Sequence, residues 1–417
     1  MSRRLVVEAY AQLTAEGYLV SRRGSGTRVK EAAGAVPVAP AAPPAAPATR
    51  PRFDLFPGSP DLARFPRRAW AAALRAALAE LPDQRLGYGH PAGAPELRAA
   101  LAEHLGRVRG AAVPTPGRVV VCGGYAQGLR LLLEELRTRG VQRVAVEEPG
   151  FPLNAMLVGA AGLEAVPVAA GAEGIDVAAL DGARVAAVVV APAHGLPLGG
   201  VLSAERRAAL VAWARAGDRL VIEDDYDAEF RYDAEPLGAL QGLAPDVVAL
   251  VGSVSKTLAP ALRLGWVVAP EDRKAAIVGH KALHDLGSPL LEQLALARLL
   301  STGGFDRHVR SVRPAYRARR DAVLAALAEH LPAARVHGVA AGLHVLVELP
   351  AGTDAAALLA AAERRRLRLY GLAMHCAGPP PFPAIVLGYA NHSEHELTQA
   401  VVLLAELACA AECRRPP

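Results

Sequence analysis

The chain has 417 residues, enough for two or three domains with a large core, and a modest formal net charge of +5 that does not by itself indicate a nucleic-acid-binding protein. Hydrophobic residues make up 52% of it, yet no run approaches the roughly 18 apolar residues of a membrane span, and we expect no signal peptide. The four cysteines lack metal-ligand spacing with histidine, so we expect free thiols, no metal site and a cytoplasmic location.

Residues 2–16 are predicted to form one amphipathic helix, because apolar residues recur at helical spacing. Ser2 can cap its start, and Gly17 can end it in the left-handed conformation. Residues 18–29 read as two short strands around Gly24, which indicates a hairpin. A helix followed by a basic hairpin is typical of the end of a winged helix-turn-helix. Charge alone would favour the alternative, an arginine-rich surface helix and hairpin.

An Ala- and Pro-rich segment, residues 31–52, is predicted to be an extended linker. From residue 53 to residue 405, helical patterns alternate with short Val-rich runs, which predicts βαβ units and a mixed, mostly parallel sheet in an α/β fold. A long helical segment at about 290–330 leads into a small C-terminal α+β subdomain with a strand at 342–348. We therefore expect four parts: 1–30, 31–52, 53–290 and 291–417.

The segment Gly252–Gly265 carries a lysine with two small hydroxyls before it and an arginine after it. Lys256 suits a Schiff base with pyridoxal phosphate, because a partly desolvated ammonium can lose its proton. The hydroxyls of Ser253 and Ser255, with Arg263, suit the cofactor phosphate. A lone motif of this kind is more often a solvated loop.

About thirty residues earlier, the chain reads Glu-Asp-Asp-Tyr after a strand-like run. Asp224 suits the pyridine nitrogen of the cofactor, and Tyr226 suits its 3′-oxygen. Alternation along an extended strand end places Asp224 and Tyr226 on one face and Asp225 on the other. We therefore expect Asp224, and not Asp225, to pair with the ring. The ordered pair of motifs is much more specific than either alone.

A third segment, Cys122-Gly-Gly-Tyr-Ala, follows a strand and opens a helix. The free backbone N–H groups of Tyr125 and Ala126 would point out of the helix N-terminus, where phosphate binds readily. An ordinary strand-to-helix turn is the alternative.

Together these segments resemble the fold-type-I pyridoxal phosphate enzymes, the aspartate-aminotransferase-like superfamily. Within it, the chain is similar to the MocR group, in which a GntR-type winged helix-turn-helix is fused to an aminotransferase-like domain. The resemblance covers about residues 53–405, and residues 2–29 match only the back part of the winged domain. The segments that carry it are Phe56–Asp61, Tyr88–Gly93, Glu148–Phe151, Glu223–Tyr232, the Lys256 segment and Val7–Tyr18.

The resemblance implies further roles in the aminotransferase-like part. The turn at Tyr125 and Ala126 would hold the cofactor phosphate, and Phe151 would stack on the ring. Tyr88 would reach the phosphate of a neighbouring subunit, which implies a homodimer.

The resemblance also implies DNA-binding positions in the N-terminal part. The helix at 2–16 would be the recognition helix, with Arg3 and Arg4 at its start near bases. Arg22 and Arg23 would lie at the wing near phosphates.

Two positions depart from the superfamily pattern. Val386 stands where an arginine usually grips the substrate carboxylate, which leaves Arg231 as another candidate for that role. Leu196 stands where an asparagine usually bonds the ring 3′-oxygen. His194 is polar and close by in the sequence, and we interpret it as structural.

Three functions remain open. The first is a pyridoxal-phosphate-binding transcription regulator that senses a small amine or amino acid. The second is a pyridoxal-phosphate-dependent aminotransferase that acts on an amino acid or amine; because of Val386, we expect weak or no turnover of common α-amino acids. The third is a cofactor-binding protein with neither activity. Because the apolar face of the N-terminal helix lacks partner helices, we expect that Met1 is an internal start or that the DNA-binding domain has decayed, and that DNA binding is weak and nonspecific.

Overall fold

The structure is a computed structural model that describes residues 2–22, 24–30, 51–232 and 237–412. The chain divides into two units, residues 1–50 and 51–417, and each is described by itself. Residues 31–50, which make up most of the predicted linker, lie outside the described residues. Arg23, one of the arginines predicted at the wing, also lies outside them.

The first unit is the predicted helix and hairpin: α1 (Arg3–Ala15), β1 (Leu19–Arg22) and β2 (Gly26–Val29). The Ser2 side chain accepts a hydrogen bond from the backbone N–H of Arg4, and Gly17 takes a φ of +80°, as expected for the two helix ends. No described side chain of α1 is buried. Its apolar face, which includes Val6, Tyr10 and Leu13, is therefore exposed within this unit.

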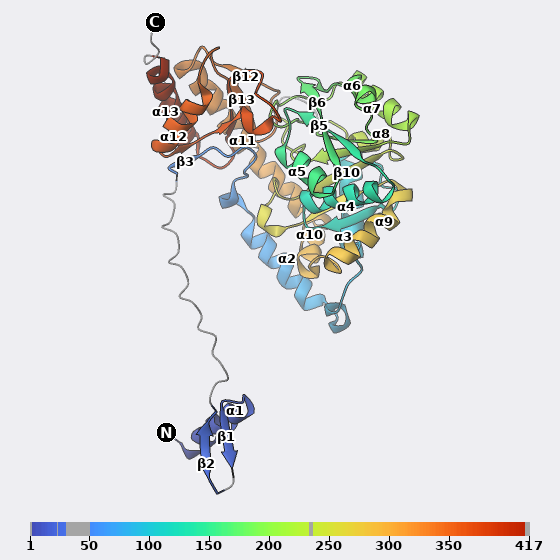
Figure 1. Cartoon of the computed structure of the whole chain (residues 1–417), viewed down its shortest axis with the longest axis vertical. Coiled ribbons are helices and arrows are strands. Elements are labelled where there is room, and N and C mark those ends of the chain that lie inside the picture. The colour runs from blue at the N-terminus through green and yellow to red at the C-terminus, as the bar shows by residue number, and fades with distance from the viewer. Residues whose placement is uncertain (1, 23, 31–50, 233–236, 413–417) are drawn as a thin grey trace. The chain divides into compact units, whose positions relative to one another are not determined.

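An eight-stranded sheet in the order β4-β11-β10-β9-β8-β5-β6-β7 organises the second unit. Figure 1 labels β5, β6 and β10 of this sheet among the helices that surround them. All its strands are parallel except β11 and β7, which confirms the expected mixed, mostly parallel sheet. The strands are β4 (Val119–Cys122), β5 (Arg143–Glu148), β6 (Glu164–Gly171), β7 (Gly174–Ile175), β8 (Ala187–Val190), β9 (Leu220–Asp225), β10 (Val248–Ser253) and β11 (Gly265–Val268).

Helices cover both faces of this sheet, because alternate strand residues point to opposite faces and both sets are apolar. Val120, Val146 and Val189 pack toward α4, α5 and α9, whereas Val121 and Val188 pack on the other face. The helices are α2 (Arg67–Glu80), α3 (Pro95–Arg109), α4 (Tyr125–Thr138), α5 (Pro152–Ala160), α6 (Ala179–Ala183), α7 (Ala204–Ala216), α8 (Leu240–Leu243), α9 (Glu271–Asp285) and α10 (Leu290–Ser301).

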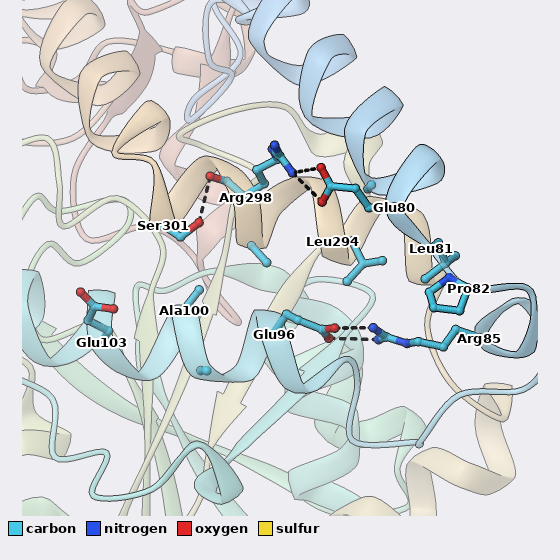
Figure 2. Close-up of a pocket in the computed structure, with 13 residues that line it drawn as sticks. Glu80, Leu81, Pro82, Arg85, Glu96, Ala100, Glu103, Leu294, Arg298 and Ser301 are labelled. Atoms are coloured by element: carbon cyan, nitrogen blue, oxygen red, sulfur yellow. Dashed lines mark hydrogen bonds and ion pairs between the residues drawn. The ribbon is translucent and has the colours of Figure 1, made fainter.

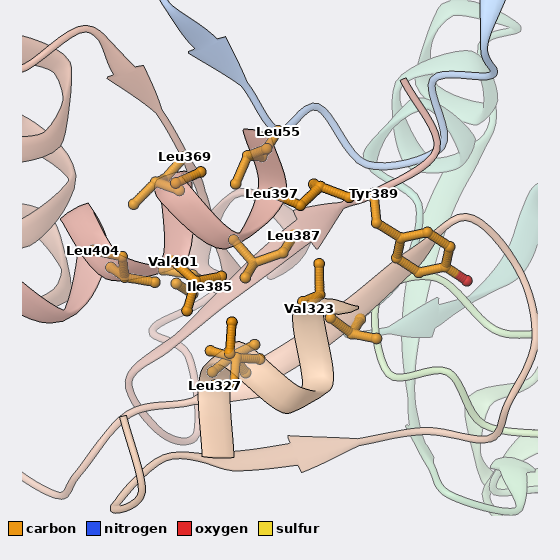
Figure 3. Close-up of a cluster of buried hydrophobic side chains, with 14 of the residues drawn as sticks. Leu55, Val323, Leu327, Leu369, Ile385, Leu387, Tyr389, Leu397, Val401 and Leu404 are labelled. Carbon is orange, nitrogen blue, oxygen red and sulfur yellow. The ribbon is translucent and has the colours of Figure 1, made fainter. Parts of the chain in front are cut away.

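A smaller α+β subdomain follows, with a four-stranded sheet in the order β12-β13-β16-β15. Its elements are α11 (Gly304–His330), β12 (Arg335–His337), β13 (His344–Glu348), α12 (Ala355–Arg364), β14 (Leu367–Arg368), β15 (Tyr370–Gly371), β16 (Ala384–Gly388) and α13 (Glu394–Glu412). Figure 3 shows its core, in which Leu55 packs with side chains of β16, α11 and α13. The short strand β3 (Phe53–Asp54) pairs with β14, so residues 53–55 pack into this subdomain although they precede the large sheet in the sequence.

The predicted long helical segment at 290–330 is two helices, α10 and α11. The chain breaks at Gly303, which has a φ of +67° and precedes the first residue of α11. A left-handed residue cannot continue a right-handed helix, so the chain changes direction there. Among the described helices, none combines the length and the apolar character needed to span a membrane.

Candidate functional site

The candidate site lies at the carboxyl edge of the large sheet, where β9 and β10 end. β9 ends with Asp224 and Asp225, and β10 ends at Ser253, three residues before Lys256. The two strands are parallel neighbours, with Asp224 opposite Val251, so the segments that follow them emerge at the same edge. The structure thus brings the predicted lysine and carboxylate together, close enough for each to shift the pKa of the other.

Lys256 is half-buried, and its amine lies beside Gly58. A Cβ atom at Gly58 would come within 3.2 Å of Lys256 Nζ, and the residue has a φ of +77°. Both facts favour glycine there. Burial lowers the pKa of the Lys256 amine, while Asp227 and Asp224 act in the opposite direction. The net lowering increases the neutral fraction, which is the form that attacks a carbonyl carbon.

The Asp224 side chain is 6% exposed, and its Oδ1 atom has no hydrogen-bond partner among the described residues. Burial raises the pKa of this carboxyl well above its usual value, and the nearby carboxylates of Asp227, Asp225 and Glu147 add to the effect. A buried carboxylate oxygen without a donor is costly. A protonated ring nitrogen placed at Oδ1 would supply that donor.

Asp225, the next residue, is bound by the side chain of Arg109. Its carboxylate accepts hydrogen bonds from Nε and Nη2 of Arg109, at 3.0 Å for the closest contacts, and both side chains are almost fully buried. The predicted separation of Asp224 from Asp225 is therefore present in the structure. Asp225 is committed to an internal ion pair, which leaves Asp224 as the carboxylate available to a ligand.

Tyr226 belongs to a buried polar cluster that the sequence did not reveal. His194 Nδ1 lies 2.8 Å from Asp227 Oδ2 and 3.1 Å from the Tyr226 hydroxyl, and the rings of His194 and Tyr226 stack. His194 and Asp227 are each about 2% exposed. One Nδ1–H group can serve both oxygens, so the cluster fixes the direction of the Tyr226 hydroxyl. In the sequence, only its place among the acidic residues around Tyr226 could have indicated that Asp227 belongs to the site.

The small subdomain packs directly on this cluster. A Cβ atom at Gly342 would lie 2.0 Å from His194 Cε1 and 2.7 Å from Asp227 Oδ2, so the close approach requires glycine. The ring of His344 lies 4.9 Å from that of His194. Burial lowers the pKa of His344 well below its usual value, and His194, His375 and Lys256 contribute to this lowering, so its imidazole is neutral near pH 7.

The predicted phosphate-binding groups gather at the N-terminus of α4. Arg263 has a φ of +50°, and its guanidinium donates to the Gly123 carbonyl. A Cβ atom at Gly124 would lie 3.2 Å from both terminal nitrogens of Arg263. The arginine therefore lies beside the first backbone N–H groups of the helix, those of Tyr125 and Ala126. A helix N-terminus with an adjacent guanidinium suits a dianionic phosphate.

The two serines hold the turn before the lysine. Ser253 is 8% exposed, and its hydroxyl accepts a hydrogen bond from the Ser255 backbone N–H at 3.3 Å. This contact shapes the turn between β10 and Lys256, and the Ser253 hydroxyl keeps a proton to donate to a phosphate oxygen.

A further network, also absent from the predictions, connects α9 to α4. The Lys281 side chain is fully buried, and its Nζ donates to both Asp285 oxygens at 2.8 Å. Asp285 also accepts from Gln127 Nε2, while Gln127 Oε1 accepts from the Gly123 N–H at 2.6 Å. The ion pair thus holds the glycine turn that contains Gly123.

Tyr125 and Phe151 form an aromatic pair, and Tyr125 lies near Asp224. Their ring centroids are 6.3 Å apart and tilted by 48°, and the Tyr125 hydroxyl donates to Asn154 Oδ1 at 2.8 Å. Burial raises the pKa of Tyr125 well above its usual value, and Asp224 adds to this. Phe151 is half-buried and keeps an exposed fraction that can contact a planar ring.

Tyr88 stands apart from these residues within the chain. It is 93% exposed, and it lines a hollow of about 590 Å³ between residues 81–95 and the segment that connects α9 to α10. An exposed aromatic residue in a glycine-bounded loop is consistent with contact to another molecule rather than to its own chain.

The two departures from the superfamily pattern meet in the structure. Val386 is fully buried, and Leu196 packs against the same apolar cluster. Arg231, the other candidate for a carboxylate, lines a separate hollow of about 180 Å³ with Arg109 and Arg313, and its Nη1 reaches the Ala193 carbonyl at 3.4 Å.

A different hollow of about 480 Å³ lies between α2, α3 and α10 (Figure 2). Four of its charged side chains pair with one another: Arg85 binds Glu96, and Arg298 binds Glu80. None of the residues that line it belongs to the Lys256 cluster. Volume alone therefore does not identify the functional site.

The residues fit pyridoxal phosphate. Lys256 is positioned for the imine, Asp224 Oδ1 lacks the donor that a ring nitrogen provides, and Arg263 stands at the start of α4. Among the described residues, no group of three or more His, Cys, Asp or Glu side chains could hold a metal ion.

Comparison with known proteins adds one family match, two relatives and one solved structure. Residues 58–404 match the model of the family described as aminotransferase class I and II. The chain is 34% identical over 403 residues to the HTH-type pyridoxine biosynthesis transcriptional regulator PdxR of Corynebacterium glutamicum, covering 95% of this chain and 86% of that protein. It is 30% identical to the probable rhizopine catabolism regulatory protein MocR of Rhizobium meliloti, covering 94% and 83%. The kynurenine aminotransferase of Pyrococcus horikoshii superposes with a TM-score of 0.80 at 25% identity, covering 88% of this chain and 93% of that structure.

Proposed function

Because the chain belongs to the aminotransferase class I and II family and is related along most of its length to MocR-type transcription regulators, we propose that it is a pyridoxal-phosphate-binding transcription regulator. In this proposal the aminotransferase-like unit senses the ligand and the N-terminal unit contacts DNA. The cofactor supplies an electrophilic carbon for amines, and its ring withdraws electrons.

The observation that carries the cofactor assignment is the unpartnered Asp224 Oδ1 beside the half-buried Lys256. Lys256 holds the cofactor covalently, and Asp224 receives the ring N–H. Tyr226, oriented by His194, donates to the ring oxygen. Arg263 and the first turn of α4 bind the phosphate.

A second candidate function, aminotransferase activity, is favoured by the complete set of imine-forming residues and by the likeness to the kynurenine aminotransferase. Val386 opposes it, because an apolar side chain cannot hold a substrate carboxylate in a productive orientation. The regulator is therefore the better-supported function.

The regulator is proposed to act in the cytoplasm as a homodimer. Tyr88 is exposed on its own subunit and would complete the phosphate site of the partner. A ligand could change DNA binding only if it binds the two arrangements of the dimer with different affinities. Arg3, Arg4 and Arg22, together with Arg23 outside the described residues, are the proposed DNA contacts.

Spectroscopy of the purified chain tests the cofactor assignment. The chain with pyridoxal phosphate should show a visible imine band, and borohydride should fix the cofactor to Lys256, as peptide mapping would show. Lys256→Ala should lose the reducible adduct, while Lys274→Ala, at a half-buried lysine paired with Glu271, should keep it. An unchanged adduct in Lys256→Ala would refute the assignment.

DNA binding tests the regulatory part. Gel-shift assays with the DNA upstream of the gene should give different affinities with and without pyridoxal phosphate. Equal affinities, together with rapid turnover of amino acids, would favour the enzyme.

A further inference from the structure

Gly123, two residues before the start of α4, is held by side chains at both of its backbone polar groups. Its N–H donates to Gln127 Oε1 at 2.6 Å, and its carbonyl accepts a hydrogen bond from Arg263 Nη2. The next residue, Gly124, has a φ of +97°, and α4 begins without a hydrogen bond from a side chain at that position. Two distant side chains therefore fix the glycine turn, and only Arg263 was predicted to bind the phosphate.

Gln127 is itself oriented by α9. Its Nε2 donates to Asp285 Oδ2 at 2.9 Å, while its Oε1 accepts from Gly123. A glutamine amide has an acceptor at one end and donors at the other, whereas an ionised carboxylate only accepts. Asp285 therefore determines which end of the amide faces Gly123.

Asp285 is fixed in turn by a buried ammonium group. The side chain of Lys281 is fully buried, and its Nζ donates to both Asp285 oxygens at 2.8 Å and to Ser288 Oγ at 3.0 Å, which uses its three donors. Burial raises the pKa of Asp285, but hydrogen bonds from Lys281 and Gln127 outweigh burial, so the pKa is lowered. The carboxyl is ionised near pH 7 and keeps its acceptor role.

The direction of the glycine turn matters because α4 offers its first free N–H groups, those of Tyr125 and Ala126, directly after it. Hydrogen bonds weaken steeply when they are bent, and a phosphate needs several donors that converge on it. Glycines at 123 and 124 leave the backbone of the turn more freedom than other residues would. The contacts of Gln127 and Arg263 limit that freedom.

We propose that Gln127 is a positioning residue for the cofactor phosphate. With Asp285 and Lys281 it holds the glycine turn so that the N–H groups of Tyr125 and Ala126 converge on the phosphate. Gln127 acts through the turn, because both ends of its amide are already bound within the chain. This inference rests on the proposed cofactor and identifies a network that sets its phosphate affinity, separate from imine formation at Lys256.

Pyridoxal provides the test, because it forms the same imine as pyridoxal phosphate and lacks only the phosphate. The cofactor-free full chain is titrated with each aldehyde, and the visible imine band gives the two dissociation constants. We expect Gln127→Leu to weaken binding of pyridoxal phosphate by at least about tenfold and binding of pyridoxal by less than about twofold. Equal losses for both aldehydes, or no loss for pyridoxal phosphate, would overturn the proposal.

Two double variants test the role of Asp285: Lys281→Met/Asp285→Asn and Lys281→Met/Asp285→Leu. Both remove the ammonium together with its carboxylate, so neither leaves an unpaired buried charge. The introduced asparagine keeps an oxygen that can accept from Gln127 Nε2, whereas a leucine of similar size has none. The first should keep the wild-type preference for pyridoxal phosphate over pyridoxal within about threefold, and the second should lose at least about fivefold of it. Equal preferences in the two would contradict the network.

Gln142→Leu, the same substitution at an exposed glutamine before β5, is the control and should leave both dissociation constants unchanged. If circular dichroism shows that Gln127→Leu is unfolded, the two double variants decide the outcome. A wild-type chain that forms no imine with pyridoxal phosphate would refute the cofactor assignment itself. A normal wild-type imine with an unchanged preference in Gln127→Leu would refute only the positioning role.

Discussion

Asp224 and Asp225 are adjacent in β9, yet Asp225 is bound by the buried guanidinium of Arg109 while Oδ1 of Asp224 has no partner among the described residues. The strand's alternation creates this difference, since neighbouring side chains leave it in opposite directions. One carboxylate therefore maintains the fold and the other is available to a ligand.

Substitution of the two carboxylates should separate these roles. Asp224→Asn should weaken pyridoxal phosphate binding by at least about tenfold and leave the free energy of unfolding of the cofactor-free protein unchanged or higher, because it removes a carboxyl group that is costly to ionise where it is buried. Asp225→Asn should cost about 3–5 kcal/mol of stability, because Arg109 loses its counterion. Denaturant titration measures the free energy of unfolding, and cofactor fluorescence measures the binding of pyridoxal phosphate. The reverse pattern would exchange the two roles.

The contact of His194 with Tyr226 should influence the imine at Lys256. Without the Nδ1–H group, the Tyr226 hydroxyl turns toward Asp227 and stabilises the cofactor oxygen less. We expect His194→Ala to raise the pKa of the visible imine band by up to about one unit. His194→Asn should recover part of the shift, whereas His375→Ala, at a buried histidine bonded to Gly150, should not change it. A spectrophotometric pH titration that shows equal pKa values in all four proteins would contradict the contact's role.

The Glu147 carboxyl should make the stability of the cofactor-free protein depend on pH. Burial raises its pKa to about 7 from 4.5, against one hydrogen bond from the Ala191 N–H. Between about pH 4.5 and pH 7 the folded state holds a proton that the unfolded state has released, so this group lowers stability as the pH rises.

Glu147→Gln should remove that contribution, which is on the order of 1–3 kcal/mol. Urea midpoints of the variant and the wild type should therefore diverge between pH 5 and pH 7. Glu205→Gln, at an exposed position of α7, is the control and should follow the wild type. Parallel curves for Glu147→Gln and wild type would exclude this role.

The proposed dimer makes a prediction about exposed apolar residues near Tyr88. Leu86 and Leu286 line the same hollow as Tyr88 and are 61% and 59% exposed. Leu286→Asp should shift the protein toward the monomer and weaken cofactor binding, because the partner's tyrosine would be withdrawn. Leu243→Asp, at a leucine that is 63% exposed on α8, should remain dimeric. Analytical ultracentrifugation measures the oligomeric state of the wild type and of both variants. A monomeric wild-type protein would refute the dimer.

DNA binding by residues 1–417 should be weak and strongly dependent on salt. Because no described side chain of α1 is buried, the helix lacks packing that would fix it against base edges. We expect contacts mainly to phosphates, and Arg3→Ala with Arg22→Ala should reduce the salt slope by about two. Arg75→Ala, at an exposed arginine of α2, should leave the salt slope unchanged. Sequence-specific binding that persists at high salt would contradict this expectation.

Local patterns in the sequence were enough to predict many of the strands and the candidate residues that follow two of them. The Val-rich runs identified β4, β5, β8, β9, β10 and β13, because a strand's period of two and its composition are readable within a few residues. Lys256 and Asp224 were predicted to lie together because each follows a strand-like run, and the structure places them at one edge of the sheet, where the ends of parallel strands meet. The break of the long helix at Gly303 was missed, since a single glycine does not always interrupt a helix.

Only the tertiary structure decided which distant side chains support these residues. His194 and Asp227 meet although 33 positions separate them, and Gln127 and Asp285 meet across 158. Leu196 and Val386 share an apolar cluster although one belongs to the large domain and the other to the small subdomain. Such contacts depend on how helices and sheets pack, and packing is set by the shapes of many side chains together, so no local period in the sequence records them.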